Sequence, residues 1–557
     1  MESNLPAANR FATHDVTNQP PPLAPYDAWA SDLPLQQAMV RAGAGWAVPA
    51  LAAYGPIAGG ELMELGFAAN ENKPRFRPFD RYGQRIDEVE FHPAYHRLME
   101  LGIAHGVPNF AWRNAATPGA HVARAALMYL HGQADQGTCC PMTMTYAAVA
   151  VFQHAPELAA EWLPRITATD YDRRSIPAWH KRGNTIGMGM TEKQGGSDVR
   201  ANTTRAFPLD AGGAGRLYEL IGHKWFLSAP MCDAFLVLAQ TDAGLSCFLL
   251  PRFAPGAAAD GTRNGIRIQR LKDKLGDWSN ASSEVEFEGA AAWLVGAEGR
   301  GVATILEMVA LTRLDCMIGS AAIMRQALVQ AIHHARQRKA FGKLLSEQPL
   351  MQNVLADLAL ESEAALALTL RVARAVDASP RDTAEAALAR IATAIGKYWV
   401  CKRCPAFVNE AQECLGGAGY VEESILPRLY RQAPLNSIWE GSGNIQCLDV
   451  LRALRRQPET RAALFAEFSA VRGAHPLLDA HVERLERELD AGEPQEARAR
   501  SLVEAMAVGL QAAQLLHGDA GAIAHSFCES RLGDSIRHSY GTLAASTPFE
   551  PIMRRAF

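Results

Sequence analysis

The spacing of hydrophobic residues changes twice along the chain, from helical to strand-like and back again. From about 36 to 185, and again after about 296, apolar residues recur at helical spacing. In the second region Leu355, Leu358 and Val372 lie on one helical face, within a stretch that contains no Gly or Pro. Between about 186 and 295, short β-rich runs have no helix-length segment between them, which favours antiparallel strands over βαβ units. The expected strands are 218–221, 234–239, 246–250, 266–268 and 285–287.

These changes predict an α+β protein made of an irregular arm and four domains. Long helices joined by short loops after about 296 indicate a helical bundle, and a break near 455–460 separates a last helical segment from it. We therefore expect a Pro-rich arm over 1–35, a helical domain over 36–185, an antiparallel β domain over 186–295, a bundle over 296–452 and a C-terminal helical domain over 453–557.

Composition and charge narrow the class of protein. The 557 residues carry 55 Lys and Arg against 59 Asp and Glu, a net charge of −4, which excludes a uniformly basic nucleic-acid-binding protein. Ten Cys at irregular spacing make no disulfide framework, and Cys401 with Cys404 is a lone pair, so no metal site is expected. No Gly-x-Gly-x-x-Gly follows a strand and no Walker-type Gly-Lys-Ser/Thr occurs, which argues against a Rossmann or P-loop enzyme. Without a secretory signal or a membrane-length apolar run, we expect a cytoplasmic protein that does not enter membranes.

A Gly-rich segment at the start of the β region, 189–201, is the first candidate ligand site. Gly195 and Gly196 let the backbone approach a ligand closely, and Thr191 and Ser197 offer neutral hydrogen-bonding groups. The same residues could instead form a β-turn whose side chains bond within the turn. Residue types alone leave both interpretations open.

A second segment, 222–228, places Trp225 three residues before Ser228 on an expected strand. A Trp on a strand can present a flat face to a planar cofactor, and a nearby Ser can hydrogen-bond a ring nitrogen. Taken alone, a core Trp and a Ser at the end of a strand is the simpler interpretation.

Two later segments add an Arg and Gly-rich turns. Residues 338–343 read Arg-Lys-Ala-Phe-Gly-Lys and are followed by Gln348; an Arg has the geometry to bind a pyrophosphate. Alone, this element would be an exposed turn between helices. Residues 412–420 contain Gly416 and Gly417, and residues 438–446 read Ile-Trp-Glu-Gly-Ser-Gly-Asn-Ile-Gln.

Together the four segments resemble the signatures of the acyl-CoA dehydrogenase family, in the family's order. The resemblance implies an acyl-CoA dehydrogenase-like fold that binds FAD, with a four-helix bundle and an extra helical C-terminal domain. It implies that Met190 and Thr191 contact the flavin edge, that Ser197 contacts the pyrophosphate, and that the 338–348 element reaches FAD from a neighbouring subunit. Two departures are Gln432, where the family carries Asp after Arg, and Trp439, where it carries Tyr. The residues expected to bind FAD are Met188, Gly189, Met190, Thr191, Ser197, Trp225, Phe226, Leu227, Ser228, Arg338, Phe341, Gln348, Gly416, Gly417, Ile438, Trp439, Ser442, Gly443 and Asn444.

Glu440 lies where most of this family carries the base that removes the α-proton of an acyl thioester. Such a base works best when shielding from water raises its pKa. One subgroup places its Glu on an earlier helix, and the matching residue here is Thr312. Glu440 could instead be a buried carboxylate paired with Arg431 or Arg452, and the bulky Trp439 could narrow the acyl pocket.

The resemblance is stronger to one branch, the AidB-type flavoproteins of the adaptive response to alkylation damage. It is carried by 35–46, 140–145, 188–198, 270–276 and 436–445, and it continues into the tail. It implies a homotetramer that binds double-stranded DNA largely without sequence specificity and protects it from alkylation, with weak dehydrogenase activity. The alternative is an active dehydrogenase of a short or branched acyl-CoA, passing electrons to an electron-transfer flavoprotein, without a DNA role.

The tail is not basic overall. Residues 453–557 contain 12 Arg and no Lys against 14 Asp and Glu, a net charge of −2. DNA binding needs clustered positive charge, which helix faces can create by segregating it. The alternative is that these arginines form ion pairs between helices. The DNA-binding candidates are Arg455, Arg456, Arg461, Arg498 and Arg500.

Overall fold

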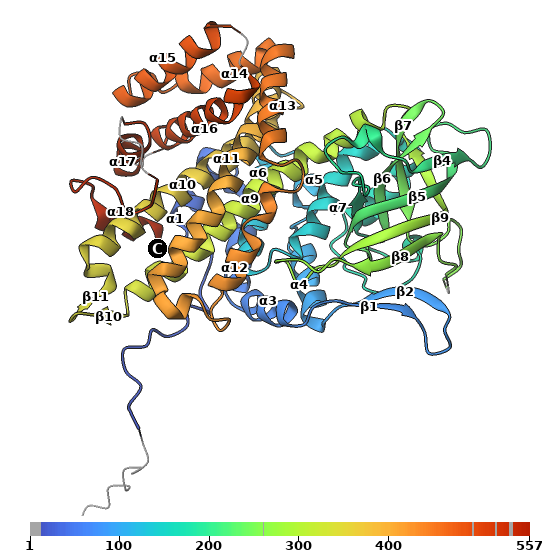
Figure 1. The fold of residues 1–557 in the computed structure, drawn as a ribbon, viewed down its shortest axis with the longest axis horizontal. Coiled ribbons are helices and arrows are strands. Elements are labelled where there is room, and N and C mark those ends of the chain that lie inside the picture. Colours follow the sequence, from blue (N-terminus) through green and yellow to red (C-terminus); the bar gives the residue numbers. More distant parts are fainter. Residues whose placement is uncertain (1–12, 260, 493–494, 519–520, 534–537) are drawn as a thin grey trace, which may run out of the picture.

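The computed structural model describes residues 13–259, 261–492, 495–518, 521–533 and 538–557. Within these residues a helical body carries a β domain on one side and a group of C-terminal helices at one end (Figure 1). Residues 1–12 of the predicted arm lie outside the described part of the chain. None of the described helices is long and apolar enough to cross a membrane.

The N-terminal domain is helical, as expected, except for one β-hairpin. Helices α6 and α7 are almost completely buried, and the long helix α9 (Gly301–Ala335) packs against both of them. The hairpin of β1 and β2 went unpredicted because its short strands are rich in charged residues, so their apolar alternation is weak. The elements are α1 (Leu33–Arg41), α2 (Val48–Ala58), α3 (Glu61–Glu71), β1 (Arg75–Phe79), β2 (Arg85–Glu90), α4 (Pro93–Ala104), α5 (Phe110–Arg113), α6 (Ala120–Ala134), α7 (Cys139–Phe152) and α8 (Pro156–Ile166).

The β domain is one seven-stranded sheet with the strand order β3-β6-β4-β5-β9-β7, in which β8 pairs with β9 and β6 also pairs with β7. The prediction of antiparallel strands holds for most pairs, but β3 and β4 each run parallel to β6. These two strands went unpredicted, because β3 is the short start of the Gly-rich segment and β4 carries Arg205 and Pro208. The strands are β3 (Ile186–Gly189), β4 (Arg205–Pro208), β5 (Leu217–Ser228), β6 (Ala234–Thr241), β7 (Gly244–Pro251), β8 (Ile266–Leu271) and β9 (Ser282–Val295).

Strand β6 shows how the sheet joins the helices. Phe235 and Val237 enter the apolar core of the β domain, whereas Leu236 and Leu238 enter a second core shared with α7, α8 and α9. Successive side chains of a strand point to opposite faces, so a continuously apolar strand is buried on both sides. The second core fixes the β domain against the helical body, next to the start of the Gly-rich segment.

The bundle contains three long helices, α9, α10 and α11, and α9 lies at its centre. Its 35 residues are apolar nearly all round, and it packs against α6, α7, α10 and α11. The bundle's last helix continues to Arg456, so the break before the tail falls just beyond the predicted boundary at 452. The elements are α9 (Gly301–Ala335), β10 (Lys339–Ala340), β11 (Lys343–Leu344), α10 (Pro349–Ala378), α11 (Thr383–Leu415), α12 (Leu426–Gln432) and α13 (Gly443–Arg456).

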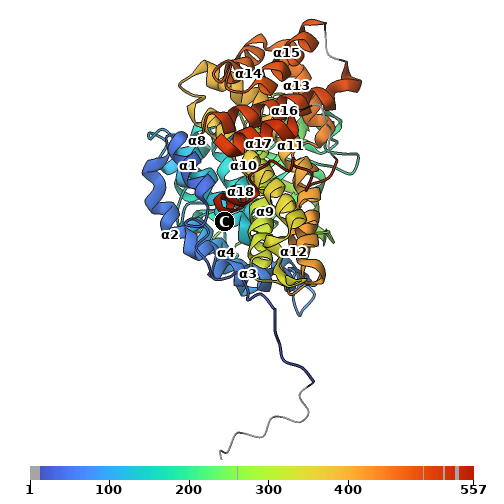
Figure 2. The ribbon, with the colours of Figure 1, turned by 90° about the vertical axis from the view of Figure 1, so that its left-hand side faces the viewer.

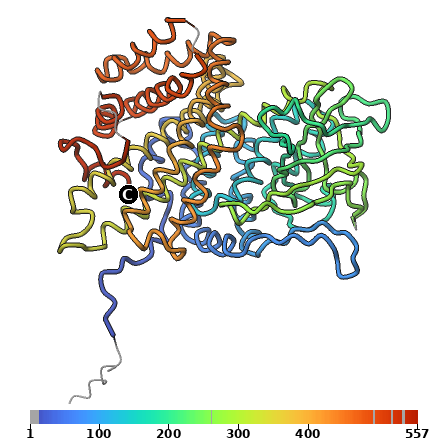
Figure 3. Tube along the Cα trace, viewed as in Figure 1, coloured from blue at the N-terminus to red at the C-terminus, as the bar shows by residue number. Residues whose placement is uncertain are grey.

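The C-terminal helices lie over one end of the bundle, and the chain then returns to it (Figures 1 and 2). Helix α16 packs on α10, α11 and α13, whereas α18 packs on α10 and α1. Arg325 of α9 and Arg336, which follows α9, donate to the backbone oxygens of Ala556 and Phe557, which holds the chain end against the bundle (Figure 3). The elements are α14 (Pro458–Ser469), α15 (Pro476–Asp490), α16 (Ala499–Leu516), α17 (Gly521–Arg531) and α18 (Phe549–Ala556).

Candidate active site

Glu440 lies in the loop before α13, held in an unusual backbone conformation. Its φ is +58°, a left-handed value that few residues other than Gly adopt, and Gly441 follows at +98°. Lys397 of α11 donates to the carbonyl oxygens of Trp439 (2.7 Å) and Gly441 (2.6 Å). Arg313 of α9 donates to the carbonyl oxygen of Glu440 at 3.0 Å. Cations from two bundle helices therefore fix the loop on both sides of the carboxylate.

The side chain of Glu440 is buried and accepts a hydrogen bond from a hydroxyl. Thr312 of α9 donates its Oγ1 to Glu440 Oε2 at 2.6 Å. Burial raises the pKa of Glu440, an effect that the Thr312 hydrogen bond and the charges of Lys397 and Arg313 only partly oppose. The residue that matches the family's alternative base position thus holds the Glu440 carboxyl.

The alternative pairing partners of Glu440 are engaged elsewhere. Arg431 forms a two-point ion pair with Glu422, with distances of 2.5 and 2.9 Å. Arg452 lies 3.7 Å from Asp449. The interpretation of Glu440 as the partner of either arginine is therefore wrong.

A cavity of about 340 Å³ opens at Glu440, between α6, α7, α9 and the loop before α13. Trp439 forms one wall, and its indole nitrogen donates to Asn436 Oδ1 at 2.9 Å, which holds the ring in place. Half of the lining residues are polar. The lining residues are Met128, Gln136, Cys139, Cys140, Thr143, Met144, Thr312, Asp315, Cys316, Asn436, Trp439 and Glu440.

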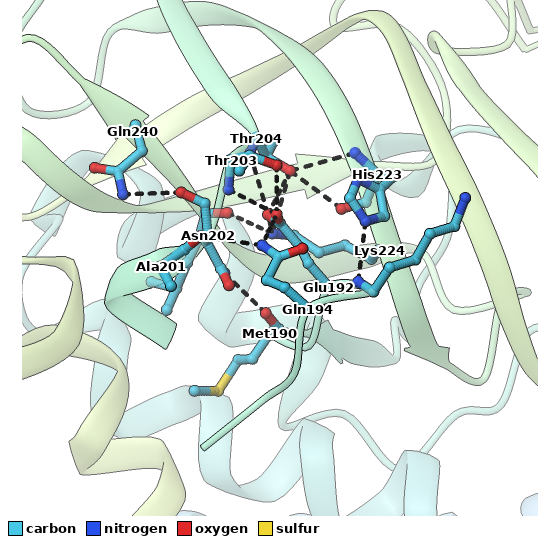
Figure 4. A network of polar contacts seen from close by, with 12 residues as sticks. Met190, Glu192, Gln194, Ala201, Asn202, Thr203, Thr204, His223, Lys224 and Gln240 are labelled. Carbon is cyan, nitrogen blue, oxygen red and sulfur yellow. Dashed lines mark hydrogen bonds and ion pairs between the residues drawn. The ribbon is translucent and has the colours of Figure 1, made fainter. Parts of the chain in front are cut away.

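The Gly-rich segment of the β domain is organised around the buried carboxylate of Glu192 (Figure 4). Its Oε1 accepts from Lys224 Nζ (2.7 Å) and Thr204 Oγ1 (2.6 Å). Its Oε2 accepts from the backbone N–H of Thr203 and the side chain of Gln194, both at 2.7 Å. One carboxylate thus ties the Gly-rich segment to β4 and β5.

Lys224 uses its remaining hydrogens inside the same network. It donates to the Leu238 carbonyl of β6 at 2.7 Å, and both its side chain and that of Glu192 are fully buried. Burial lowers the pKa of Lys224 to about 8, although Glu192 opposes that shift. Burial alone would raise the pKa of Glu192, but Lys224 and the hydrogen bonds lower it to about 2. The pair is therefore ionised near neutral pH and compensates its own charge.

Part of the predicted FAD set meets where the β domain joins the helices. Met188, Met190 and Trp439 share the core between sheet and helices. The backbone N–H of Trp225 donates to the Thr191 carbonyl at 2.8 Å, which places the first two predicted segments side by side. The Ser228 hydroxyl hydrogen-bonds the Cys140 thiol, and Cys140 lines the Glu440 cavity.

Several of these residues present little side chain to a ligand. Leu227 and Met188 are buried in apolar cores, and Gly189 packs against the Leu227 side chain. Lys272 Nζ lies 3.3 Å from the centre of the Trp225 ring, so a cation covers one face of the indole. Ser197 is exposed, as are Phe226 and Ile438.

The predicted elements from the bundle lie apart from this junction. Arg338, Phe341 and Gln348 belong to the β10–β11 hairpin and its flank, at the end of the bundle away from the β domain (Figure 1). Phe341 is completely exposed, Gln348 donates to the Ala340 carbonyl, and Arg338 donates to the Asn18 carbonyl of the N-terminal arm. The hairpin therefore does not reach the β domain of its own chain.

The Gly-rich turns at the ends of α11 and α13 are open. Gly416 and Gly417 are exposed, with no atom within 4 Å of where a Cβ would be, and Gly416 has a φ of +62°. Ser442 and Gly443 begin α13, and Asn444 accepts a hydrogen bond from Arg500 Nε at 2.9 Å. A residue of the C-terminal domain therefore contacts a predicted FAD residue.

The candidate DNA-binding arginines do not form one free cluster. Arg461 pairs with Asp490 at 2.6 Å, Arg498 pairs with Glu488 at 3.0 Å, and Arg500 bonds Asn444. Arg455 and Arg456 lie in the last turn of α13 and are exposed. Ion pairs between helices, the alternative stated for these residues, thus account for Arg461 and Arg498.

Some residues that organise the site escaped the sequence analysis. Lys397 and Arg313 act through backbone carbonyls of a distant loop, a contact that no local pattern indicates. Glu192 lies within the Gly-rich segment and Lys224 lies next to Trp225. Their places in these two segments were the signal that could have identified this pair. Their burial depends on the pairing of β4, β5 and β6, which the sequence did not specify.

The described C-terminal helices also bring together His475, His525 and Glu529, whose possible ligand atoms lie within 4.8 Å of one another. His475 Nδ1 already accepts from the N–H of Leu477 at 3.3 Å, and its Nε2 lies 3.2 Å from His525 Nδ1. With both nitrogens of the buried ring engaged, the contact joins α15 to α17 as a hydrogen-bonded pair of imidazoles.

Comparison with known proteins identifies the class of protein. Residues 18–173 match the adaptive response protein AidB N-terminal domain, 187–290 the acyl-CoA dehydrogenase middle domain, and 299–455 the acyl-CoA dehydrogenase C-terminal domain. The chain therefore belongs to the acyl-CoA dehydrogenase family, whose members are FAD-dependent.

Similarity to individual proteins covers most of the chain. AidB of Escherichia coli (strain K12) is 48% identical over 94% of this chain and 95% of its own length. Acyl-CoA dehydrogenase family member 11 of Caenorhabditis elegans is 32% identical over 72% of this chain and 66% of its own. The crystal structure of Caenorhabditis elegans ACDH-11 in complex with C11-CoA superposes with a TM-score of 0.83 at 26% identity, covering 96% of both chains. These findings confirm the predicted family and fold.

Proposed function

We propose that this chain is an FAD protein of the AidB branch in which Glu440 is the base for α,β-dehydrogenation of an acyl thioester, with weak turnover. The observation that carries the proposal is Glu440 itself, a buried carboxyl with a raised pKa that opens into a cavity. A base must accept a weakly acidic α-proton, and a raised pKa increases the driving force for that transfer.

The surrounding residues position the base and limit the space beside it. Thr312 orients the carboxyl, while Lys397 and Arg313 hold its backbone. Bound FAD supplies the two-electron acceptor that the reaction requires. Trp439 is fixed by Asn436, so its bulky ring limits the space for an acyl chain, which supports weak turnover on simple acyl-CoAs.

The residues present suit a flavin nucleotide. At Gly195 no atom lies within 4 Å of where a Cβ would be, so the backbone of this segment is open to a ligand. Met190, Thr191, Trp225 and Ser228 would hold the ring system, and Ser197 the pyrophosphate. Their proximity to the Glu440 cavity supports these roles.

The remaining FAD contacts are proposed to come from a neighbouring subunit of a homotetramer. Arg338, Phe341 and Gln348 lie far from the β domain of their own chain, and Phe341 is fully exposed. A second chain would bring this hairpin to the cofactor and cover exposed side chains such as Leu350 and Tyr420.

A second candidate role is cytoplasmic protection of double-stranded DNA from alkylation, with binding largely independent of sequence. It is supported by the 48% identity to AidB, which extends through 94% of the chain and hence into the C-terminal helices. Arg455, Arg456, Arg461, Arg498 and Arg500 are the candidates, and the ion pairs of Arg461 and Arg498 reduce the charge that they can offer. The alternative remains an active dehydrogenase that passes electrons to an electron-transfer flavoprotein and has no DNA role.

One experiment separates the two roles. The yellow protein is mixed anaerobically with a panel of acyl-CoAs while flavin absorbance is followed, and duplex DNA is titrated in parallel at several salt concentrations. Slow bleaching with steeply salt-dependent DNA binding supports the proposal. Rapid stoichiometric bleaching without DNA retention would favour the alternative.

The rate of flavin reduction is expected to fall at low pH, and the fall should begin at a higher pH than it would for a solvated Glu. Because burial raises the pKa of Glu440 above the ordinary Glu value of 4.5, the base is protonated and inactive up to a higher pH than a solvated Glu. The rate should therefore rise as pH increases through this raised value. Stopped-flow reduction measured from pH 4 to 9 tests the shift, and a fall in rate centred at or below pH 4.5 would contradict it.

The Arg456→Gln variant is expected to lower the salt dependence of DNA binding. Removing one phosphate-neutralising charge should reduce the slope of log K against log salt concentration by about 1. Arg374→Gln, an exposed arginine of α10, is the matched control and should leave the slope unchanged. Equal slopes for the wild type and both variants would remove Arg456 from the interface.

A further inference from the structure

A second cavity, of about 400 Å³, lies between the β1–β2 hairpin and the β domain. None of its lining residues lines the cavity at Glu440. Four arginines line it, one from β2, one from the end of β7 and two from the β8 region: Arg85, Arg252, Arg263 and Arg267. Such a concentration of guanidinium groups around one small cavity calls for compensating negative charge.

Three of these arginines have carboxylate partners. Arg85 pairs with Asp87 at 2.8 Å, and Arg263 pairs with Glu88 at 2.6 Å. Arg267 pairs with Glu288 at 3.1 Å. Glu88 belongs to the hairpin, so its pair with Arg263 joins the hairpin to the β domain, whereas the other two pairs lie within β2 and between β8 and β9. The three pairs leave the fourth arginine without an ion-pair partner.

Arg252 is that fourth arginine, and it is buried, with 6% of its surface exposed. Its Nη1 contacts two neutral groups, Ser175 Oγ at 3.2 Å and Met231 Sδ at 3.3 Å. Its Nε is buried without any hydrogen-bond partner. Among the described residues no carboxylate lies within ion-pair distance of Arg252. The nearby Asp233 pairs with Lys181 at 2.8 Å.

A buried guanidinium without a counter-charge is costly, because desolvation is not repaid by an ion pair. Burial lowers the pKa of Arg252, and the charge of Arg263 adds to that effect, whereas the charges of Asp233 and Glu88 oppose it only in part. The ring of Phe253, 5.1 Å from the guanidinium carbon, offers only a weak cation–π contact. A bound anion in the adjoining cavity would supply the missing ion-pair partner.

We propose that this cavity is a binding site for a small oxyanion, a phosphate or carboxylate group, held by Arg252. A guanidinium presents a planar set of donors that matches either group. An anion there would bridge the hairpin and the sheet, independently of flavin and DNA.

The test measures binding of inorganic phosphate to the yellow holoprotein by calorimetry and by the thermal midpoint. Acetate is the second probe, with chloride at matched ionic strength as the reference. Arg252→Met removes the charge but keeps the length of the side chain, and Arg182→Gln, an exposed arginine before the β domain, is the matched control. Loss of a charge-assisted contact should weaken binding by roughly tenfold to hundredfold in Arg252→Met and leave Arg182→Gln unchanged.

The two probes separate the ligand types, since the group that binds more tightly identifies whether phosphate or carboxylate is preferred. We expect that oxyanion to raise the thermal midpoint of the wild type, but not that of Arg252→Met. In chloride alone, Arg252→Met should be at least as stable as the wild type, because it no longer buries an unpaired charge. Binding equal in wild type and Arg252→Met, or no shift in the wild-type midpoint with either probe, would overturn the proposal.

Discussion

Replacing Glu440 with glutamine is expected to slow acyl-CoA-dependent flavin reduction by about 10²–10⁴-fold, the usual contribution of a positioned base. Glutamine has the same shape, and its carbonyl oxygen can still accept the Thr312 hydrogen bond, but it cannot accept the α-proton. The protein should remain yellow, since Glu440 is proposed to act on substrate and not to hold FAD. Anaerobic stopped-flow absorbance, with the acyl-CoA that bleaches the wild type fastest, measures the effect.

The control for this variant is Glu459→Gln, which removes an exposed carboxylate of α14 and should leave the reduction rate unchanged. If Glu440→Gln reduces its flavin as fast as the wild type does, Glu440 is not the base. Thr312→Val is an intermediate case, in which the carboxyl remains but its orienting hydrogen bond is lost. Its rate should fall between those of the wild type and Glu440→Gln.

The Lys224→Met variant is expected to destabilise the β domain by about 3–5 kcal/mol, the range for breaking a buried ion pair on one side. Glu192 would then be buried with its hydroxyl and amide donors but without a cation. Because Glu192 ties the Gly-rich segment to β4 and β5, the variant should also lose FAD on gel filtration. Thermal unfolding and flavin content, measured on the same preparation, test both effects.

Two comparisons make this result specific. Lys193→Met changes the exposed neighbouring lysine and should shift stability by no more than about 0.5 kcal/mol. In a Glu192→Gln background, Lys224→Met should cost much less, because the uncompensated charge is already gone. An equal cost in both backgrounds would mean that packing of the lysine, and not its charge, stabilises the domain.

Much of the fold followed from local patterns in the sequence. The long apolar runs of α9 and α10 and the continuously hydrophobic β6 were readable because burial on every side leaves a simple signature. The hairpin of β1 and β2 could not be predicted in this way, because its short strands are largely polar and pack against β8, which is distant in the sequence. Parallel pairing of β3 and β4 with β6 was also beyond local pattern, since it depends on the path of the chain.

The candidate site divides in the same way. Glu440, Thr191 and Trp225 could be named as candidates because their segments resemble the signatures of the acyl-CoA dehydrogenase family. The groups that position them could not, as Lys397 lies 43 residues before Glu440 and acts on backbone atoms. For the DNA-binding candidates the sequence shows only the number and order of the arginines. Their ion pairs depend on the fold, in which Arg461 and Arg498 pair with acidic residues of a neighbouring helix.

The return of the chain end to the bundle makes the last helices an integral part of the body, unlike an appended module. Arg531 and Arg555 supply counter-charges to Asp357, Glu361 and Glu363, which α10 buries. A fragment containing only the tail would lack those acids, and a chain shortened before α17 would leave Asp357 and Glu363 without these partners, whereas Glu361 would keep Arg403. The C-terminal helices, which carry most of the candidate DNA-binding arginines, are therefore held to the bundle by buried ion pairs and do not form a separate module.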